Sequence, residues 1–199
     1  MMLRSFIAVE IPPEIQNEIS RSIAPLQKAL PKPLVRWVAA QNVHLTLKFL
    51  GDVSSENLDQ LANELRSETI NHESFCIPVG GVGAFPNPRR ARVIWIGLEA
   101  SPALKTLLHG VEAVAAKLGY AAEERPFSPH LTVGRVGKNI SGADPQTIQT
   151  ALERMHVGAL GTIRISAVHV FKSDLRPEGP IYTCLYTLPM KPAREEFTA

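Results

Sequence analysis

An eight-residue motif occurs twice in this 199-residue chain, as HLTLKFLG from His44 and as HLTVGRVG from His130. The copies begin 86 residues apart, and each lies between a long helical pattern and a shorter one. In the first copy apolar and polar residues alternate with a period of two, which predicts a strand. The spacing is too long for a solenoid repeat of about 20 to 50 residues. The duplication therefore predicts two related lobes that face each other.

Strand and helix patterns are interleaved along the whole chain. We expect strands at 5–11, 43–50, 75–82, 93–98, 127–136, 163–171 and 181–188. We expect helices that begin near Pro12–Pro13, Ser54 or Ser55, Ser101–Pro102 and Asp144–Pro145. Gly51–Asp52 is expected to end the first motif's strand. Pairs of strands joined by short breaks favour an antiparallel α+β fold over a parallel doubly wound sheet.

The composition is that of a globular protein, with 45% hydrophobic and 20% charged residues. The net charge of +2 is too small to indicate nucleic-acid binding by itself. Cys76 and Cys184 are far apart and lack the spacing of zinc or redox motifs, so we expect two reduced cysteines in strands. The N-terminus does not match a signal peptide, and no run of about 18 apolar residues occurs. We therefore expect a cytoplasmic protein that does not enter a membrane.

The two motifs carry the chemistry. His44 and Thr46, like His130 and Thr132, stand at i and i+2 on a predicted strand, so each pair projects to one side roughly 6.5 to 7 Å apart. If the lobes are related by an approximate twofold, two imidazoles and two hydroxyls converge on one centre. Displacement at phosphorus needs a base and an acid, and a histidine pKa near 6.5 allows one neutral and one charged ring.

A simpler interpretation is a strand face with polar residues toward solvent, which would suit a single His-x-Thr. Two copies with His, Leu and Thr at equal offsets favour function instead. A metal site is disfavoured because no carboxylate or cysteine stands at ligand spacing within either motif. We expect neither a metal nor a cofactor.

A loop rich in proline and arginine precedes the predicted strand at 93–98. Its arginines, Arg89, Arg90 and Arg92, would suit RNA phosphates, although a solvated hairpin tip explains them equally well. Phe85, Phe49 or Trp95 would suit stacking on a base. Aromatic residues on strands are more often buried in a core, and we expect this of Trp95.

Nearly the whole chain resembles the two-histidine phosphoesterases, and within them the RNA 2',3'-cyclic phosphodiesterases, also called 2'-5' RNA ligases. The resemblance rests on the paired HxTx motifs within VRWVAAQNVHLTLKFLGDV and RPFSPHLTVGRV, and on RSFIAVEIP, GAFPNPRRARVIWIGLE and VFKSDLRPEGPIY. It implies two pseudo-symmetric antiparallel sheets with outer helices and a central cleft that carries both motifs. We expect one such bilobal domain over 1–190 and a flexible tail at 191–199.

The resemblance also implies roles for individual residues. His44 would donate a proton to the leaving 3'-oxygen, His130 would activate water, and Thr46 and Thr132 would bind the phosphate. The family's further phosphate-binding arginine falls on Arg135. Strict alternation places Arg135 opposite His130, so a twist or a bulge at Gly134 is needed.

The leading hypothesis is a monomeric hydrolase that converts RNA 2',3'-cyclic phosphate ends to 2'-phosphomonoesters. Ligation of such an end to a 5'-hydroxyl follows from microscopic reversibility. Two alternatives remain open. One is a phosphodiesterase for small cyclic nucleotides or 2',5'-oligoadenylates, and the other is a module that binds RNA ends without cutting them.

Overall fold

The computed structural model describes residues 1–124, 126–177 and 179–193. Its strands are β1 (Met2–Glu10), β2 (Val35–Trp37), β3 (His44–Ser54), β4 (Phe75–Phe85), β5 (Val93–Leu98), β6 (His130–Val136), β7 (Ala159–Ile165), β8 (Ala167–Arg176) and β9 (Gly179–Pro189). Its helices are α1 (Pro13–Ala29), α2 (Ser55–Thr69), α3 (Pro102–Lys117) and α4 (Asp144–Arg154). Two short 3₁₀ turns, η1 (Ala40–Asn42) and η2 (Pro88–Arg90), complete the elements.

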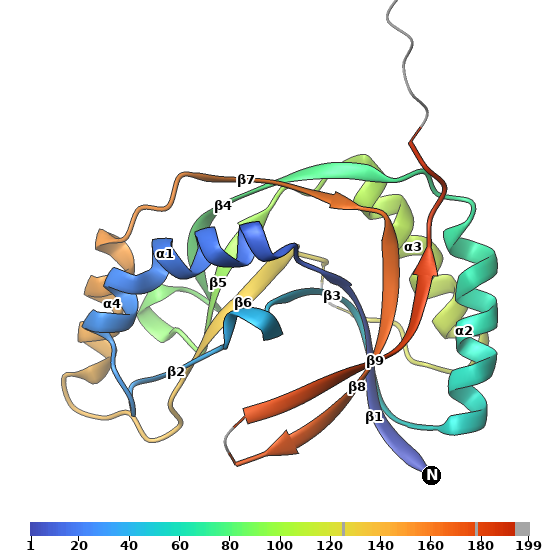
Figure 1. The fold of residues 1–199 in the computed structure, drawn as a ribbon. Coiled ribbons are helices and arrows are strands. Elements are labelled where there is room, and N and C mark those ends of the chain that lie inside the picture. Colours follow the sequence, from blue (N-terminus) through green and yellow to red (C-terminus); the bar gives the residue numbers. More distant parts are fainter. Residues whose placement is uncertain (125, 178, 194–199) are drawn as a thin grey trace, which may run out of the picture.

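The strands form one curled antiparallel sheet in the order β7-β4-β5-β6-β3-β1-β8-β9, with β2 paired to β6 (Figure 1). Two halves meet at its centre. The β6 half holds β6, β5, β4 and β7, and the β3 half holds β3, β1, β8 and β9. β3 and β6 are joined through one register pair, Leu45 with Leu131. The α+β class and the antiparallel arrangement are confirmed, and the two motifs lie where the halves meet.

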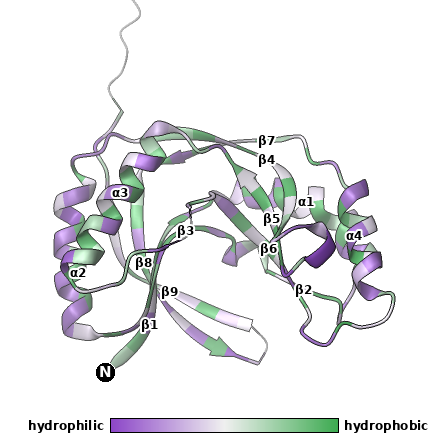
Figure 2. Cartoon of the chain, turned by 180° about the vertical axis from the view of Figure 1, so that it is seen from behind, coloured by the Kyte–Doolittle hydropathy of each residue, from purple (hydrophilic) through white to green (hydrophobic). Residues whose placement is uncertain are grey.

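Two helices cover each half of the sheet. Helices α2 and α3 pack together over the β3 half, and α1 and α4 pack over the β6 half (Figure 1). α1 buries Ile15, Ile19, Ile23 and Leu26, which recur at the three- and four-residue spacing of one helix face. In Figure 2, α2 and α4 carry both apolar and polar residues, as expected for helices with one face on a sheet and one in solvent. The helices thus leave the opposite face of the central strands to the two motifs.

The prediction that Gly51–Asp52 ends the strand is wrong, because β3 continues to Ser54. Ser5 pairs with Gly51 whereas Phe6 pairs with Phe49, so one extra residue bulges out of β3. Gly51 has a φ of 72°, a left-handed conformation that glycine adopts without a steric penalty. The glycine therefore bends the strand at a bulge and does not terminate it.

The strand expected at 163–171 is two strands, β7 and β8, separated at Ser166. β7 pairs with β4 and β8 pairs with β1, so the chain crosses here from one half of the sheet to the other. Beyond β9, the Lys191 N–H donates to the carbonyl of His72, and the Ala193 N–H donates to Ser74 Oγ. Most of the expected tail, 194–199, lies outside the described residues.

Candidate active site

The register between β3 and β6 places the four motif side chains in one square. Leu45 and Leu131 are Cα partners in an antiparallel pair. Extending that register by one residue each way places His44 opposite Thr132 and Thr46 opposite His130. Directly opposite Cβ atoms are about 4.5 to 5.5 Å apart, and diagonal neighbours are roughly 7 to 8 Å apart or somewhat less. The two imidazoles occupy one diagonal and the two hydroxyls the other.

A β-bulge follows the threonine in both motifs. In β3, Lys48 pairs with Ile7 and Thr46 with Ala8, which leaves Leu47 as the extra residue. In β6, Gly134 pairs with Ile94 and Thr132 with Trp95, which leaves Val133 as the extra residue. The two repeats thus share an irregularity of the backbone as well as a sequence.

The bulges reset the alternation of the side chains. Val133 and Gly134 are both buried and Arg135 is exposed, so Arg135 returns to the face of His130, which we call the histidine face. The bulge that the sequence required for Arg135 is present. In β3 the same shift buries Lys48 and exposes Phe49.

Both histidine rings are oriented by the same kind of hydrogen bond. Nδ1 of His44 lies 2.7 Å from the carbonyl oxygen of Asn42, and Nδ1 of His130 lies 2.8 Å from that of Ser128. A carbonyl only accepts, so each Nδ1 donates its proton to the carbonyl and each Nε2 is left without that bond. Each ring therefore has Nε2 available for proton transfer.

His44 has a distinct electrostatic environment. Burial is the main cause that lowers its pKa below the ordinary value of about 6.5. The Asn42 hydrogen bond opposes this shift, and the charges of Arg135 and His130 add to it. Phe6 stacks on the ring at 4.8 Å between centroids, and Tyr182 meets it edge-on at 5.1 Å. In the free protein His44 is therefore neutral at pH 7.

Tyr182 is a site residue that the sequence did not reveal. Burial raises the pKa of its hydroxyl, and the charges of Arg135 and Arg36 oppose the shift. It comes from the β8–β9 hairpin, near whose tip the carbonyl of Pro180 accepts a hydrogen bond from Asn42. The hairpin thus contacts the segment that orients His44.

The surroundings of His130 are aromatic too. Phe85 meets the His130 ring edge-on at 4.9 Å, and Trp95 lies 5.3 Å from Phe85. The expectation that Trp95 is a core residue is wrong, because it is only half-buried and is the register partner of Thr132 on the histidine face. Its indole N–H is nevertheless buried and has no hydrogen-bond partner in the part of the chain that the structure describes.

The predicted arginine cluster lies in the segment between β4 and β5. Arg89 and Arg90 lie on η2, which packs against α4. Arg92 is exposed at the bend immediately before β5. A role of these three arginines in binding RNA stays a prediction.

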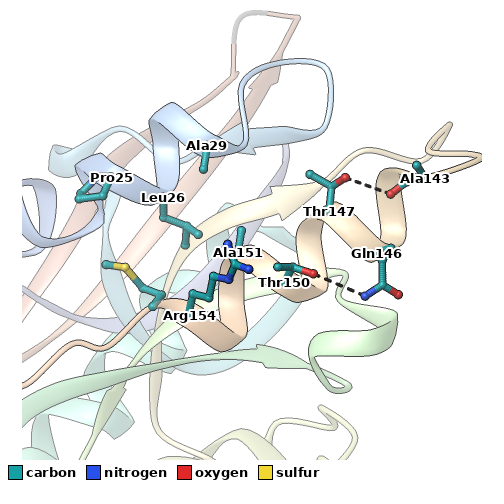
Figure 3. A pocket seen from close by; sticks show the side chains of 10 residues that line it. Pro25, Leu26, Ala29, Ala143, Gln146, Thr147, Thr150, Ala151 and Arg154 are labelled. Atoms are coloured by element: carbon teal, nitrogen blue, oxygen red, sulfur yellow. Dashed lines mark hydrogen bonds between the residues drawn. The ribbon is translucent and has the colours of Figure 1, made fainter.

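A recess between two helices lies away from the two motifs. It has a volume of about 530 Å³ and separates α1 from α4 (Figure 3). Its walls include Pro25, Leu26 and Ala29 on one side and Thr147, Thr150 and Ala151 on the other. None of the motif residues lines it.

No cluster of three or more His, Cys, Asp or Glu side chains in 1–124, 126–177 and 179–193 is arranged to hold a metal ion. No helix within these ranges is both long and apolar enough to cross a membrane.

Comparisons with known proteins match most of the chain. The family described as LigT like Phosphoesterase matches residues 9–95 and 96–182, so that each matched segment contains one motif. The RNA 2',3'-cyclic phosphodiesterase of Methanothermobacter thermautotrophicus is 36% identical over 183 residues, which cover 92% of this chain and 96% of the relative. The protein of the same name from Thermotoga maritima is 31% identical over 191 residues, and the alignment covers 92% of this chain and 94% of that protein.

Solved structures show the same fold. The crystal structure of Escherichia coli LigT complexed with 3'-AMP superposes with a TM-score of 0.74 at 27% identity, and the alignment covers 96% of this chain and 99% of that one. LigT complexed with phosphate gives a TM-score of 0.70 at 25% identity over 96% and 98% of the chains. With a duplicated motif, a matching architecture and matched segments over most of its length, the chain belongs to the LigT-like phosphoesterase family.

Proposed function

We propose that this protein hydrolyses the 2',3'-cyclic phosphate at the end of an RNA and leaves a 2'-phosphomonoester. The observation that carries the proposal is the register of β3 and β6, which sets two imidazoles on one diagonal and two hydroxyls on the other. The names of the relatives, RNA 2',3'-cyclic phosphodiesterase, support the choice of substrate.

The diagonal arrangement suits in-line displacement at phosphorus. His130 Nε2 accepts a proton from a water molecule as that water attacks the phosphorus atom. The bond from phosphorus to the 3'-oxygen breaks on the opposite side, and His44 Nε2–H supplies the proton that the leaving oxygen needs. Thr46 and Thr132 donate hydrogen bonds to the non-bridging oxygens. General acid and base catalysis of this kind contributes about 10² to 10⁴ each to the rate.

The lowered pKa of His44 makes the order of events important. A neutral His44 in the free protein cannot donate a proton from Nε2. A bound phosphate anion next to the ring favours the charged form of His44. Substrate binding therefore raises the pKa of His44 and promotes protonation of its Nε2. The low pKa also favours a second assignment, in which His44 is the base and His130 the acid.

The same step accommodates an alcohol in place of water. A 5'-hydroxyl that attacks the phosphorus atom would give a 2'-5' linkage and would need the same base and acid. We therefore include ligation in the proposal as a side reaction of the site.

Phosphorus NMR of the product tests the proposal. An oligonucleotide with a 2',3'-cyclic phosphate is incubated with purified protein in EDTA, and the signal of a 2'-phosphomonoester is expected to replace that of the cyclic ester. A 3'-phosphomonoester, or loss of turnover on addition of the chelator, would contradict it. Turnover confined to small cyclic nucleotides or 2',5'-oligoadenylates would favour the small-substrate alternative, and tight RNA binding without turnover would favour the binding module.

A further inference from the structure

A row of nearly bare positions runs across the sheet from His130. His130 of β6 is the Cα partner of Gly97 of β5, and Gly97 is the partner of Gly80 of β4. Gly80 is in turn the partner of Ala159 of β7. Directly opposite residues of antiparallel strands project to the same face, so the four positions lie on the histidine face. Beyond the imidazole the row carries a single methyl group over three strand spacings, or about 14 Å.

The floor of this row is main chain. A Cβ at Gly97 would lie 2.8 Å from the carbonyl oxygen of Gly80, and a Cβ at Gly80 would lie 2.6 Å from that of Gly158. The close approach of neighbouring segments therefore requires both Gly80 and Gly97. Gly158 differs, because a Cβ there meets nothing within 4 Å and its φ is not left-handed. The fold would accept a side chain at Gly158, and the space above it is open.

The bare positions line a trough of about 420 Å³, which we call the glycine trough. Its volume is within the range of about 300 to 1,000 Å³ that is usual for small-molecule sites. Trp95 stands beside it, because a Cβ at Gly97 would lie 3.5 Å from Cζ3 of the indole. Glu99 is exposed at the edge and is the one ionisable residue among the described residues that line the trough.

The glycine trough lies on the extension of the line that joins the two motif histidines. The step from His44 to His130 is one strand across and two residues along the strands. Because β5 is antiparallel to β6, an equal second step leads from His130 to Glu99, just past the end of β5. The attacking and leaving oxygens lie roughly in line through phosphorus in such a displacement. With the leaving oxygen at His44 and the attacking oxygen at His130, any group carried by the attacking oxygen lies over the trough.

The chemistry of the glycine trough fits a nucleoside better than a phosphate. A water molecule carries nothing on its attacking oxygen, so hydrolysis has no use for this space. The 5'-hydroxyl of a second RNA carries a nucleoside, and that nucleoside has no phosphate on its 5' side. The Glu99 carboxylate at the edge would repel a phosphate, whereas it accepts hydrogen bonds from ribose hydroxyls. The occupant that these features favour is therefore an uncharged nucleoside.

We propose that the glycine trough binds the 5'-terminal nucleoside of an RNA whose 5'-hydroxyl attacks the cyclic phosphate. The inference rests on the proposed function, with His130 as the base, and gives ligation a binding site of its own. A bond forms between the 5'-oxygen and phosphorus as the hydroxyl proton passes to His130 Nε2. The bond from phosphorus to the 3'-oxygen breaks as His44 Nε2 supplies a proton to that oxygen. The product is a 2'-5' linkage, and the two RNA ends are the only reactants.

The test lets water and an alcohol compete for one reacting complex. An oligonucleotide with a 2',3'-cyclic phosphate end is incubated with the protein and either a 5'-hydroxyl oligonucleotide or methanol. Chromatography gives the ratio of transfer product to hydrolysed product per mole of alcohol. Both products come from the same complex, so a general loss of activity or of folded protein cancels from this ratio. Gly158→Ala, Gly158→Leu and Gly158→Phe are compared with Ser67→Phe, a control on the exposed surface of α2.

The wild-type ratio is expected to favour the 5'-hydroxyl oligonucleotide over methanol at least about tenfold, because a bound nucleophile has a raised effective concentration. In Gly158→Leu and Gly158→Phe the ratio for the oligonucleotide falls about tenfold, because the new side chain occupies the trough. The ratio for methanol stays within about twofold, because methanol needs no trough. Gly158→Ala shows a smaller loss, and Ser67→Phe shows none.

Three results would overturn the inference. They are equal wild-type ratios for the oligonucleotide and methanol, an oligonucleotide ratio that Gly158→Phe leaves unchanged, and ratios for the two alcohols that fall together. Hydrolysis without any transfer to the oligonucleotide would also refute the nucleoside site, while the proposed hydrolysis would stand. Failure of the proposed function is distinct, because the wild-type protein would then give neither hydrolysis nor transfer.

Discussion

Leu45 of β3 and Leu131 of β6, the middle residues of the two His-Leu-Thr motifs, face each other directly across the centre of the sheet. Their side chains are 1% and 0% exposed on the face opposite the histidines. Because of this pair, two copies of a short sequence become one site, and each histidine stands beside the threonine of the other copy.

Replacement of the leaving oxygen by sulfur identifies the acid. A 2',3'-cyclic substrate with sulfur at the 3' position expels a thiolate, which needs no proton because thiols have a pKa near 8.5. If His44 is the acid, His44→Ala recovers most of its lost activity on this substrate and His130→Ala does not. Rate measurements on the oxygen and sulfur substrates check this, and recovery by His130→Ala alone would reverse the two roles.

The charge of Arg135 contributes to the lowered pKa of His44. Removing that positive charge makes the imidazolium easier to form, so Arg135→Met is expected to raise the pKa of His44. NMR titration of the histidine ring signals measures this directly. Arg66→Met is the control, and an unchanged or lower pKa in Arg135→Met would contradict the environment described.

The same lowered pKa predicts how stability depends on pH. Below about pH 6.5 the unfolded chain takes up a proton on His44 that the folded protein does not, so the free energy of unfolding falls as pH drops toward the folded pKa. Above that range the contribution is fully present. Urea unfolding between pH 5 and 8 is expected to show that the free energy of unfolding depends less on pH in His44→Gln than in the wild type. The same pH dependence in both proteins would contradict the lowered pKa of His44.

Gly83 makes room for Trp95. A Cβ at Gly83 would overlap the Trp95 indole, which lies beside Thr132 on the histidine face. Gly83→Ala is expected to destabilise the protein by about 1 to 3 kcal/mol and to change the tryptophan fluorescence. Gly158→Ala is the matched control, because a Cβ there meets nothing within 4 Å. Equal stability of the two variants would contradict this account.

Lys48 joins β3 to the segment that precedes β6. Its buried ammonium donates to Glu112 Oε2 and to the carbonyl of Ala121, each at 2.6 Å. Lys48→Met is expected to cost about 1 to 3 kcal/mol, because both acceptors lose their donor. Chemical unfolding of Lys48→Met, of Glu112→Gln and of the double variant gives the interaction free energy between Lys48 and Glu112. The exposed Lys105→Met should change stability by no more than about 0.5 kcal/mol.

The sequence was sufficient for the helices and for the two His/Thr pairs, because both follow from local periodicity. It was insufficient wherever the partner strand decides the outcome. The bulges after Thr46 and Thr132 exist only relative to β1 and β5, so the outward turn of Phe49 was not predictable. For Arg135 a bulge was required, but nothing local showed that one forms.

Arg36 and Tyr182 were missed for related reasons. β2 has three residues, too few for a periodic pattern, and its pairing with β6 is a long-range contact. Tyr182 reaches His44 from the distant β8–β9 hairpin. In the case of Trp95, its residue type suggested the core, whereas the register puts it on the histidine face.

The most direct test of the central claim is the kcat of His44→Ala, His130→Ala and the double variant on an oligonucleotide ending in a 2',3'-cyclic phosphate. If the two rings act on one phosphorus atom, each single variant loses at least about 10²-fold, and the double variant loses much less than the product of the two. Wild-type turnover in either single variant, or losses that simply multiply, would contradict it.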